Sequence, residues 1–240
     1  MQTADFMTAL ARDGAAFSAA CEVAGMDAPV PSCPEWTVAD LMWHLAEVHD
    51  FWTVVVRDRV EYPDAYVEPE RPPAADLPAF YRDRLAGVVE VLSAADPAQQ
   101  NWTWTADHSA GFVQRRMAHE TAMHLTDAQA AAGLALSVEP ELASDGIDEF
   151  LEYFRSRSTD APAAGGSVHL HCTDVAGEWT VREVDGERLV TREHAKGDCA
   201  LRGPASDLLL VLWRRVPLSA ADVVGDAEVA ARFVAYANLD

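Results

Sequence analysis

The segment GFVQRRMAHETAMHLTDAQAAA, residues 111–132, has the pattern that most clearly indicates a helical fold for the N-terminal half of the chain. On a helix that advances about 100° per residue, Val113 and Met117 share one stripe with Glu120, His124 and Asp127. A carboxylate or imidazole buried among apolar groups costs several kcal/mol unless it is paired or bound to a metal. We therefore expect partners for these three polar side chains inside a helical fold.

Glu120 and His124 are four residues apart, so both side chains can reach a single ion from one face of the helix. The same spacing also fits an ordinary hydrogen bond between a buried glutamate and a buried histidine. The letters HETAMH do not form the zinc-protease motif, because that motif needs histidines four apart, and His119 and His124 are five apart. We assign His119 to the solvent-facing side of the helix.

Four long helices are predicted before Pro140, and start or stop signals mark several of their ends. Thr37 can cap the second helix, with Asp40 three residues later, while Gly25 and Gly133 are expected to end the first and fourth. The expected helices cover residues 3–25, 37–59, 78–95 and 111–132, and five prolines mark 62–78 as a connector. Helices of this length make an antiparallel four-helix bundle the expected arrangement.

Beyond Pro140 the pattern changes to short strands and shorter helices. We expect helices over 142–154, 205–215 and 227–238, strands over 168–172 and 198–203, and two strands in 178–193 around an Asp185-Gly186 turn. These elements form a small antiparallel sheet backed by helices. The predicted fold class is therefore α+β with two domains, a helical bundle over residues 1–140 and a small α+β domain over residues 141–240.

The composition limits the classes of partner. A net charge of −21 argues against nucleic acid and against an anionic membrane surface, because both need clustered Lys and Arg. The N-terminal segment has no basic region and no continuous apolar run, so we expect neither a signal peptide nor a membrane anchor, and a cytoplasmic location. No CxxC pair occurs, and we expect free thiols at Cys21, Cys33, Cys172 and Cys199. The oligomeric state stays open.

A third metal ligand must come from a different helix, and the second predicted helix offers His44 and His49. His49 lies within the stripe formed by Val38, Leu45 and Trp52, whereas His44 lies at its edge. A single histidine on such a face is more often a hydrogen-bonded core residue than a ligand. Periodicity does not choose between the two.

Two blocks resemble the mycothiol-dependent maleylpyruvate isomerase family of actinobacteria, a branch of the DinB-like metal-binding bundles. They are CPEWTVADLMWHL, residues 33–45, and RRMAHETAMHLTDAQAA, residues 115–131. The segment CALRGPASDLLLVLWRRVPL, residues 199–218, is similar to the sterol-carrier-like C-terminal domain of that family. The resemblance covers nearly the whole chain and implies a DinB-like four-helix bundle followed by a small α+β domain.

The resemblance also implies a metal site. The first block ends in the family's metal-binding histidine, which points to His44 rather than His49, and the second block supplies Glu120 and His124. The implied ion is divalent, with zinc expected, and the implied thiol cofactor is mycothiol. Three protein ligands leave at least one coordination position open, as in catalytic zinc sites.

Other residues are assigned roles beside the metal. Asp127 is expected to orient a ligand ring, with an acid turned to solvent as the alternative. By similarity Arg215, and less so Arg214, contacts substrate from the second domain, and the alternative is a solvated arginine at a helix end. Trp102 and Trp104 are expected to cover the end of the bundle rather than wall the pocket.

The implied chemistry is that of an activated thiol, because a thiol beside a dication loses its proton. In the resembled isomerase the thiolate adds to a cis double bond, rotation follows, and elimination gives the trans isomer. Related bundles leave the thiol on an electrophile. We therefore expect an isomerase or thiol S-transferase that acts on a small-molecule electrophile or unsaturated acid. The alternatives are a non-catalytic protein that binds a metal or small ligand, and a metal-dependent hydrolase, for which no general base is obvious.

Overall fold

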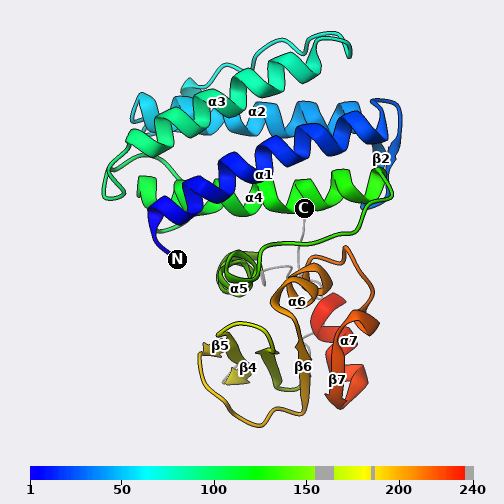
Figure 1. Cartoon of the computed structure of the whole chain (residues 1–240). Coiled ribbons are helices and arrows are strands. Elements are labelled where there is room, and N and C mark those ends of the chain that lie inside the picture. Colours follow the sequence, from blue (N-terminus) through cyan, green and yellow to red (C-terminus); the bar gives the residue numbers. More distant parts are fainter. Residues whose placement is uncertain (155–164, 185–186, 236–240) are drawn as a thin grey trace. The chain divides into compact units, whose positions relative to one another are not determined.

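The structure is a computed structural model that describes residues 1–154, 165–184 and 187–235. The chain divides into two compact units, Met1–Leu136 and Ser137–Asp240. The first unit is helical and the second combines a sheet with helices (Figure 1). The predicted α+β class with an N-terminal four-helix bundle is confirmed.

Four long helices build the first unit and lie side by side (Figure 1). Each packs mainly against two neighbours, in the circular order α1, α4, α2, α3. Their bounds are α1 Thr3–Ala24, α2 Val38–Arg57, α3 Leu77–Ala94 and α4 Ala110–Ala131, and a 3₁₀ turn η1 covers Pro63–Ala65. All four expected helices are therefore present within a few residues of their predicted ends.

The helix directions differ from the prediction of an antiparallel bundle. The ring of Trp43 packs 5.6 Å from that of Phe80, and further along both helices Asp50 pairs with Arg84 at 2.6 Å. These contacts advance together along α2 and α3, so the two helices run in the same direction. The long connector between them carries the chain back along the bundle, because adjacent parallel helices cannot be joined by a tight turn.

Local signals fix where α2 and α4 begin. Thr37 caps α2, and its hydroxyl accepts from the Asp40 backbone N–H while the Asp40 carboxylate accepts from the Thr37 N–H. Ser109 caps α4 through the backbone N–H of Phe112. The two caps therefore define the first residue of each helix, and with it the position of every later side chain along the helix axis.

Helix α4 is buried on more faces than one amphipathic stripe predicts, because α1 and α2 both pack along it. Thr121 and Thr126 are fully buried, and His119 is only 6% exposed. The His119 ring meets the ring of Phe6 on α1 edge-on, with the centroids 5.9 Å apart. The assignment of His119 to the solvent side is therefore wrong, since that side of α4 faces α1.

A two-stranded hairpin joins α1 to α2, in a segment for which no helix or strand was predicted from the sequence. Strands β1 (Pro29–Val30) and β2 (Cys33–Thr37) pair antiparallel, with Pro29 opposite Thr37 and Val30 opposite Cys33. Strands this short show no clear alternation, which is why periodicity did not reveal them. The hairpin leads directly into the cap of α2.

The second unit contains a five-stranded sheet in the order β5-β4-β3-β6-β7. Three of the strand pairings are antiparallel, but β3 and β6 run parallel, with Val168 opposite Cys199 and Leu170 opposite Leu201. The sheet is therefore mixed: it is mainly antiparallel, as expected, but includes one parallel pair that was not predicted. Its strands are β3 Val168–Cys172, β4 Glu178–Val184, β5 Glu187–Thr191, β6 Cys199–Gly203 and β7 Asp222–Gly225.

Three helices accompany this sheet, as expected. They are α5 Pro140–Glu149, which continues as a π-helical turn η2 Phe150–Phe154, α6 Ala205–Leu212 and α7 Ala227–Ala235, with a 3₁₀ turn η3 at Leu218–Ala220. Strand β7 was missed because four residues leave little pattern. The predicted turn at 185–186 and the predicted helix end beyond residue 235 lie outside the described residues. Within the described ranges, no helix is long and apolar enough to cross a membrane.

Candidate metal centre

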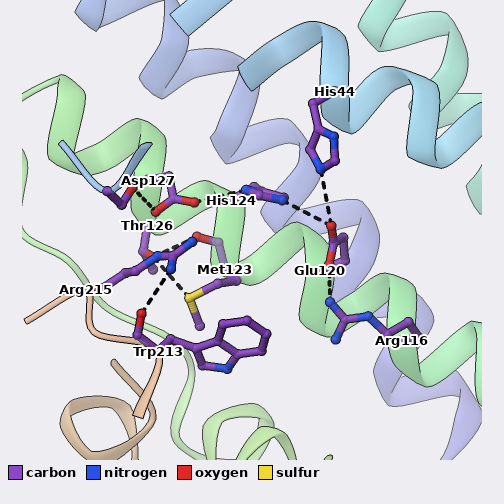
Figure 2. A network of polar contacts seen from close by, with 10 residues as sticks. His44, Arg116, Glu120, Met123, His124, Thr126, Asp127, Trp213 and Arg215 are labelled. Carbon is purple, nitrogen blue, oxygen red and sulfur yellow. Dashed lines mark hydrogen bonds and ion pairs between the residues drawn. The ribbon is translucent and has the colours of Figure 1, made fainter. Parts of the chain in front are cut away.

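Three predicted ligands meet between α2 and α4 (Figure 2). Glu120 Oε1 lies 3.1 Å from His124 Nε2 and 3.6 Å from His44 Nε2. The two imidazole rings stand edge to face, with their centroids 5.0 Å apart. The two nitrogens and the carboxylate oxygen all lie within 4.8 Å of one another, so one ion can contact all three.

The spacing suits a small divalent ion. Around a tetrahedral ion with bonds of about 2.1 Å, neighbouring ligand atoms lie about 3.4 Å apart. The two distances from Glu120 Oε1 to the histidine nitrogens, 3.1 and 3.6 Å, lie on either side of that value. Zinc commonly binds two imidazoles and one carboxylate. In a four-coordinate ion these three residues would leave one coordination position for another molecule.

Asp127 holds the ring of His124 from the other side (Figure 2). The Nδ1 atom of His124 lies 3.0 Å from Asp127 Oδ2, and the hydroxyl of Ser32, in the β1–β2 hairpin, donates to Oδ1 at 2.6 Å. A carboxylate accepts here, so Nδ1 carries a proton, and Nε2 is the ring nitrogen that faces the candidate site. Asp127 is fully buried, which excludes the alternative of an acid turned to solvent.

Arg116 binds the far oxygen of Glu120 (Figure 2). Its guanidinium, one helical turn away, donates to Oε2 and leaves Oε1 facing the two histidines. Burial alone would raise the pKa of Glu120, but the positive charge of Arg116 and the contacts of His124 and His44 hold it well below its ordinary range. Glu120 is therefore an anion aimed at the site through one oxygen.

The surroundings of His124 change its pKa in opposite directions. Burial lowers its pKa, while the charge of Glu120 and the hydrogen bond to Asp127 raise it, and the net result is a pKa of about 9. Without a metal the ring therefore carries a proton at neutral pH and forms an ion pair with Glu120. A metal that binds through Nε2 has to displace that proton.

Solvent reaches the site from the side of His44. The His44 side chain is 33% exposed, compared with 17% for Glu120 and 12% for His124. The ring of Trp36 on β2 packs 5.0 Å from the His44 ring. His44 is therefore the most solvent-exposed of the three ligands, and Trp36 lies beside it.

The two tryptophans of the loop before α4 lie elsewhere. Trp102 stacks on Trp52 with ring centroids 6.0 Å apart, and Trp104 meets Phe112 edge-on at 5.6 Å. Trp52 is eight residues beyond His44 on α2, about 12 Å along the helix. These contacts agree with the expectation that the pair covers the end of the bundle.

His49 is a core residue in this structure. It is fully buried, and its Nε2 lies 2.9 Å from the hydroxyl of Thr121 on α4. Burial lowers the pKa of His49 to about 3, so the ring stays neutral. Of the two histidines between which periodicity did not choose, His44 is the one that lies close to Glu120 and His124, and its role as a metal ligand stays a prediction.

Arg215 lies just after α6 in the second unit. Its guanidinium donates to the Trp213 carbonyl at 3.0 Å and sits over the Trp213 ring, 5.9 Å from the centroid. Arg214 adopts a left-handed backbone conformation with φ of 56°. The chain therefore turns sharply after α6, and the contact of Arg215 with substrate stays a prediction.

Sequence reasoning missed two partners of the site. Arg116 was given no role, although its spacing of four residues from Glu120 is the signal for an i, i+4 ion pair. Ser32 gave no signal, because it reaches Asp127 across 95 residues of sequence through the unpredicted hairpin.

Comparison with known proteins agrees with this architecture. The family model for the mycothiol maleylpyruvate isomerase N-terminal domain matches residues 7–129, and the model for the C-terminal domain of that family matches residues 141–232. The chain therefore belongs to the mycothiol maleylpyruvate isomerase family. A comparison with curated proteins gave no match.

Two crystal structures share the fold. One is the mycothiol-dependent maleylpyruvate isomerase, with 10% sequence identity and a TM-score of 0.59 over 88% of this chain and 88% of that one. The other is a mutant of that isomerase in which a histidine is replaced by alanine, with 10% identity and a TM-score of 0.59 over 99% and 92%. At this identity the likeness establishes the fold and not the reaction.

Proposed function

We propose that this chain is a metal-dependent enzyme that uses mycothiol, with one divalent ion held by His44, Glu120 and His124. The observation that carries the proposal is the meeting of two imidazole nitrogens and one carboxylate oxygen at metal-ligand spacing. Zinc is the proposed ion because it accepts this donor set in the four-coordinate geometry that the spacing fits. Family membership supports the choice of thiol.

The protein side of the chemistry is to hold the three ligands and leave access for a thiol. An ion bound there would lower the pKa of an entering thiol and supply a thiolate at neutral pH. Asp127 fixes the His124 ring so that Nε2 faces inward, and Arg116 holds the Glu120 carboxylate so that a single oxygen does. The exposed side of His44 leaves an approach for thiol and electrophile.

The proposed substrate is a small electrophile or an unsaturated acid, which the thiol attacks in cis–trans isomerisation or in S-transfer. An anionic substrate is repelled by a chain of net charge −21, so it needs a local cation. We propose Arg215 for that contact, on the basis of family resemblance. Its guanidinium can bind a carboxylate through two parallel hydrogen bonds.

A thiol-consumption assay tests the proposal. The zinc-reconstituted chain is mixed with mycothiol and a panel of cis-unsaturated acids and activated halides, and both free thiol and product geometry are followed. Loss of thiol indicates S-transfer, whereas a trans product without net thiol loss indicates isomerisation. His44→Ala should abolish either activity, and His108→Ala, at an exposed histidine outside the site, should retain it.

Two other outcomes would replace the proposal. A chain that binds zinc through these residues but never turns over a thiol substrate would be a non-catalytic binding protein. Thiol-independent hydrolysis that depends on His44 would indicate a metal hydrolase.

A further inference from the structure

A second group of histidines lies in the C-terminal unit, far along the chain from the residues of the proposed active site. Strand β3 reads Val-His-Leu-His-Cys over 168–172, so His169 and His171 are two residues apart and project from the same face of the sheet. Val168, Leu170 and Cys172, on the other face, are buried. The strand thus presents two imidazoles side by side.

Two further donors join them. Glu178, the first residue of β4, stands directly opposite His171 in the antiparallel register. His194 follows β5, in a segment that Thr180 holds against the sheet by donating its hydroxyl proton to the Glu193 carbonyl at 3.1 Å. Three sequence segments therefore converge on one point of this face.

The ligand atoms are close enough to share an ion. Glu178 Oε1 accepts a hydrogen bond from His171 Nδ1, and it lies 2.9 Å from His194 Nδ1 and 3.9 Å from His169 Nε2. All four atoms lie within 4.8 Å of one another. Three imidazoles and one carboxylate form a complete tetrahedral set of the kind that zinc accepts.

One ligand atom of the group, His169 Nε2, is buried without a hydrogen-bond partner among the described residues. His169 as a whole is 6% exposed. A buried imidazole nitrogen without a partner is costly, and native proteins rarely leave one. A cross-strand ion pair between Glu178 and the other two histidines leaves this nitrogen unsatisfied, whereas a bound cation satisfies it.

The group is also accessible. His171, Glu178 and His194 line a pocket of about 570 Å³ within the second unit, together with Arg192 and Asp148. The His194 side chain is 76% exposed, so an ion can enter without opening the fold. Among these lining residues, Arg192 pairs with Asp148 at 2.7 Å.

We propose that His169, His171, Glu178 and His194 form a second divalent-metal site, which binds Zn²⁺ and fastens the segment after β5 to the sheet. The four protein ligands fill a tetrahedral shell, so the site is structural, in contrast to the three-ligand site of the bundle. It is independent of the proposed enzymatic function, because none of its ligands belongs to the bundle.

Zinc titration of the full-length chain, monitored by calorimetry and by metal analysis after gel filtration, tests this site. The wild-type chain should bind about two equivalents, and His194→Ala and His171→Ala about one. Loss of one ligand should weaken the second site at least about a hundredfold, since even the loss of a ligand's outer partner costs roughly 10- to 100-fold. His194 is exposed, so His194→Ala should fold normally, and His108→Ala is the matched histidine control.

This experiment tests the second metal site independently of the metal site in the bundle. If His194→Ala and His171→Ala bind as much zinc as His108→Ala, the second site does not exist, whatever the bundle does. If His44→Ala retains one equivalent that His194→Ala in the same chain removes, the second site stands alone. Amide hydrogen exchange of residues 192–198 should slow on adding zinc to the wild-type chain and not to His194→Ala. Unchanged exchange in both would overturn the fastening role.

Discussion

Asp127→Asn isolates the contribution of the group that orients His124. Asparagine has nearly the shape of aspartate, so the fold should persist, but its carboxamide has no charge with which to hold the Nδ1–H at 3.0 Å. Loss of such a partner typically weakens metal binding 10- to 100-fold, which is about 1.4 to 2.7 kcal/mol. This effect alone lowers affinity at every pH.

Proton competition acts in the opposite direction. Burial lowers the pKa of His124, but Glu120 and Asp127 raise it to about 9, so only about 1% of metal-free molecules have a neutral ring at pH 7. We therefore expect zinc to bind about a hundredfold more weakly at pH 7 than above pH 9. Asparagine at 127 removes one of the two carboxylates that raise this pKa, so the variant loses part of that penalty.

The two effects separate in a titration against a chromophoric chelator from pH 6.5 to 9.5, in a His194→Ala background so that only the bundle site is measured. In the His194→Ala chain, called the parent here, the affinity for zinc should rise about tenfold per pH unit and level off near pH 9. Asp127→Asn should level off at lower pH, with its full deficit of about 10- to 100-fold at pH 9.5. Equal zinc affinities of the two chains at pH 9.5 would exclude the proposed contribution of Asp127. An affinity of the His194→Ala chain that does not change between pH 7 and 8 would exclude proton competition at His124.

Three further outcomes are expected. His49→Ala should retain the metal, but its free energy of unfolding in urea should fall by about 1 to 3 kcal/mol, because the buried hydroxyl of Thr121 loses its hydrogen-bond partner. Loss of metal in this variant would mean that His49, and not His44, is the ligand. Below pH 6.5 His49 is protonated in the unfolded chain but not in the folded chain, where burial lowers its pKa to about 3. The free energy of unfolding should therefore fall by up to about 1.4 kcal/mol for each pH unit below 6.5. His49→Gln should reduce this dependence on pH, and an unchanged dependence would contradict a buried neutral His49. Arg215→Ala should leave zinc content unchanged and lower kcat/KM by roughly 10- to 1,000-fold for an anionic substrate; undiminished turnover would remove Arg215 from the site.

The helices were predictable because their signals are local. Thr37 with Asp40 and the terminal Gly25 and Gly133 each act within a turn or two of the chain, and the structure has helices at those places. Helix directions and strand partners depend on contacts between distant segments. That is why the parallel run of α2 and α3, and the parallel pairing of β3 with β6, were not foreseen.

The same distinction applies to the side chains around the candidate site. Periodicity on α4 placed Glu120, His124 and Asp127 on one face, and the structure brings them together. It failed for His119, since a helix enclosed by two neighbours has more than one buried side. The four-residue group around Glu178 escaped notice because its members come from three segments whose register only the folded sheet defines.

The proposed function requires that an ion held by His44, Glu120 and His124 bind the thiol of mycothiol as a thiolate. Its most direct test is the near-ultraviolet spectrum of the cobalt-substituted chain, in the His194→Ala background, titrated with mycothiol. A saturable sulfur-to-cobalt charge-transfer band should appear in this chain and also when His49→Ala is added, and should be absent when His44→Ala is added. No band in the parent, or an equal band with His44→Ala, would contradict the account.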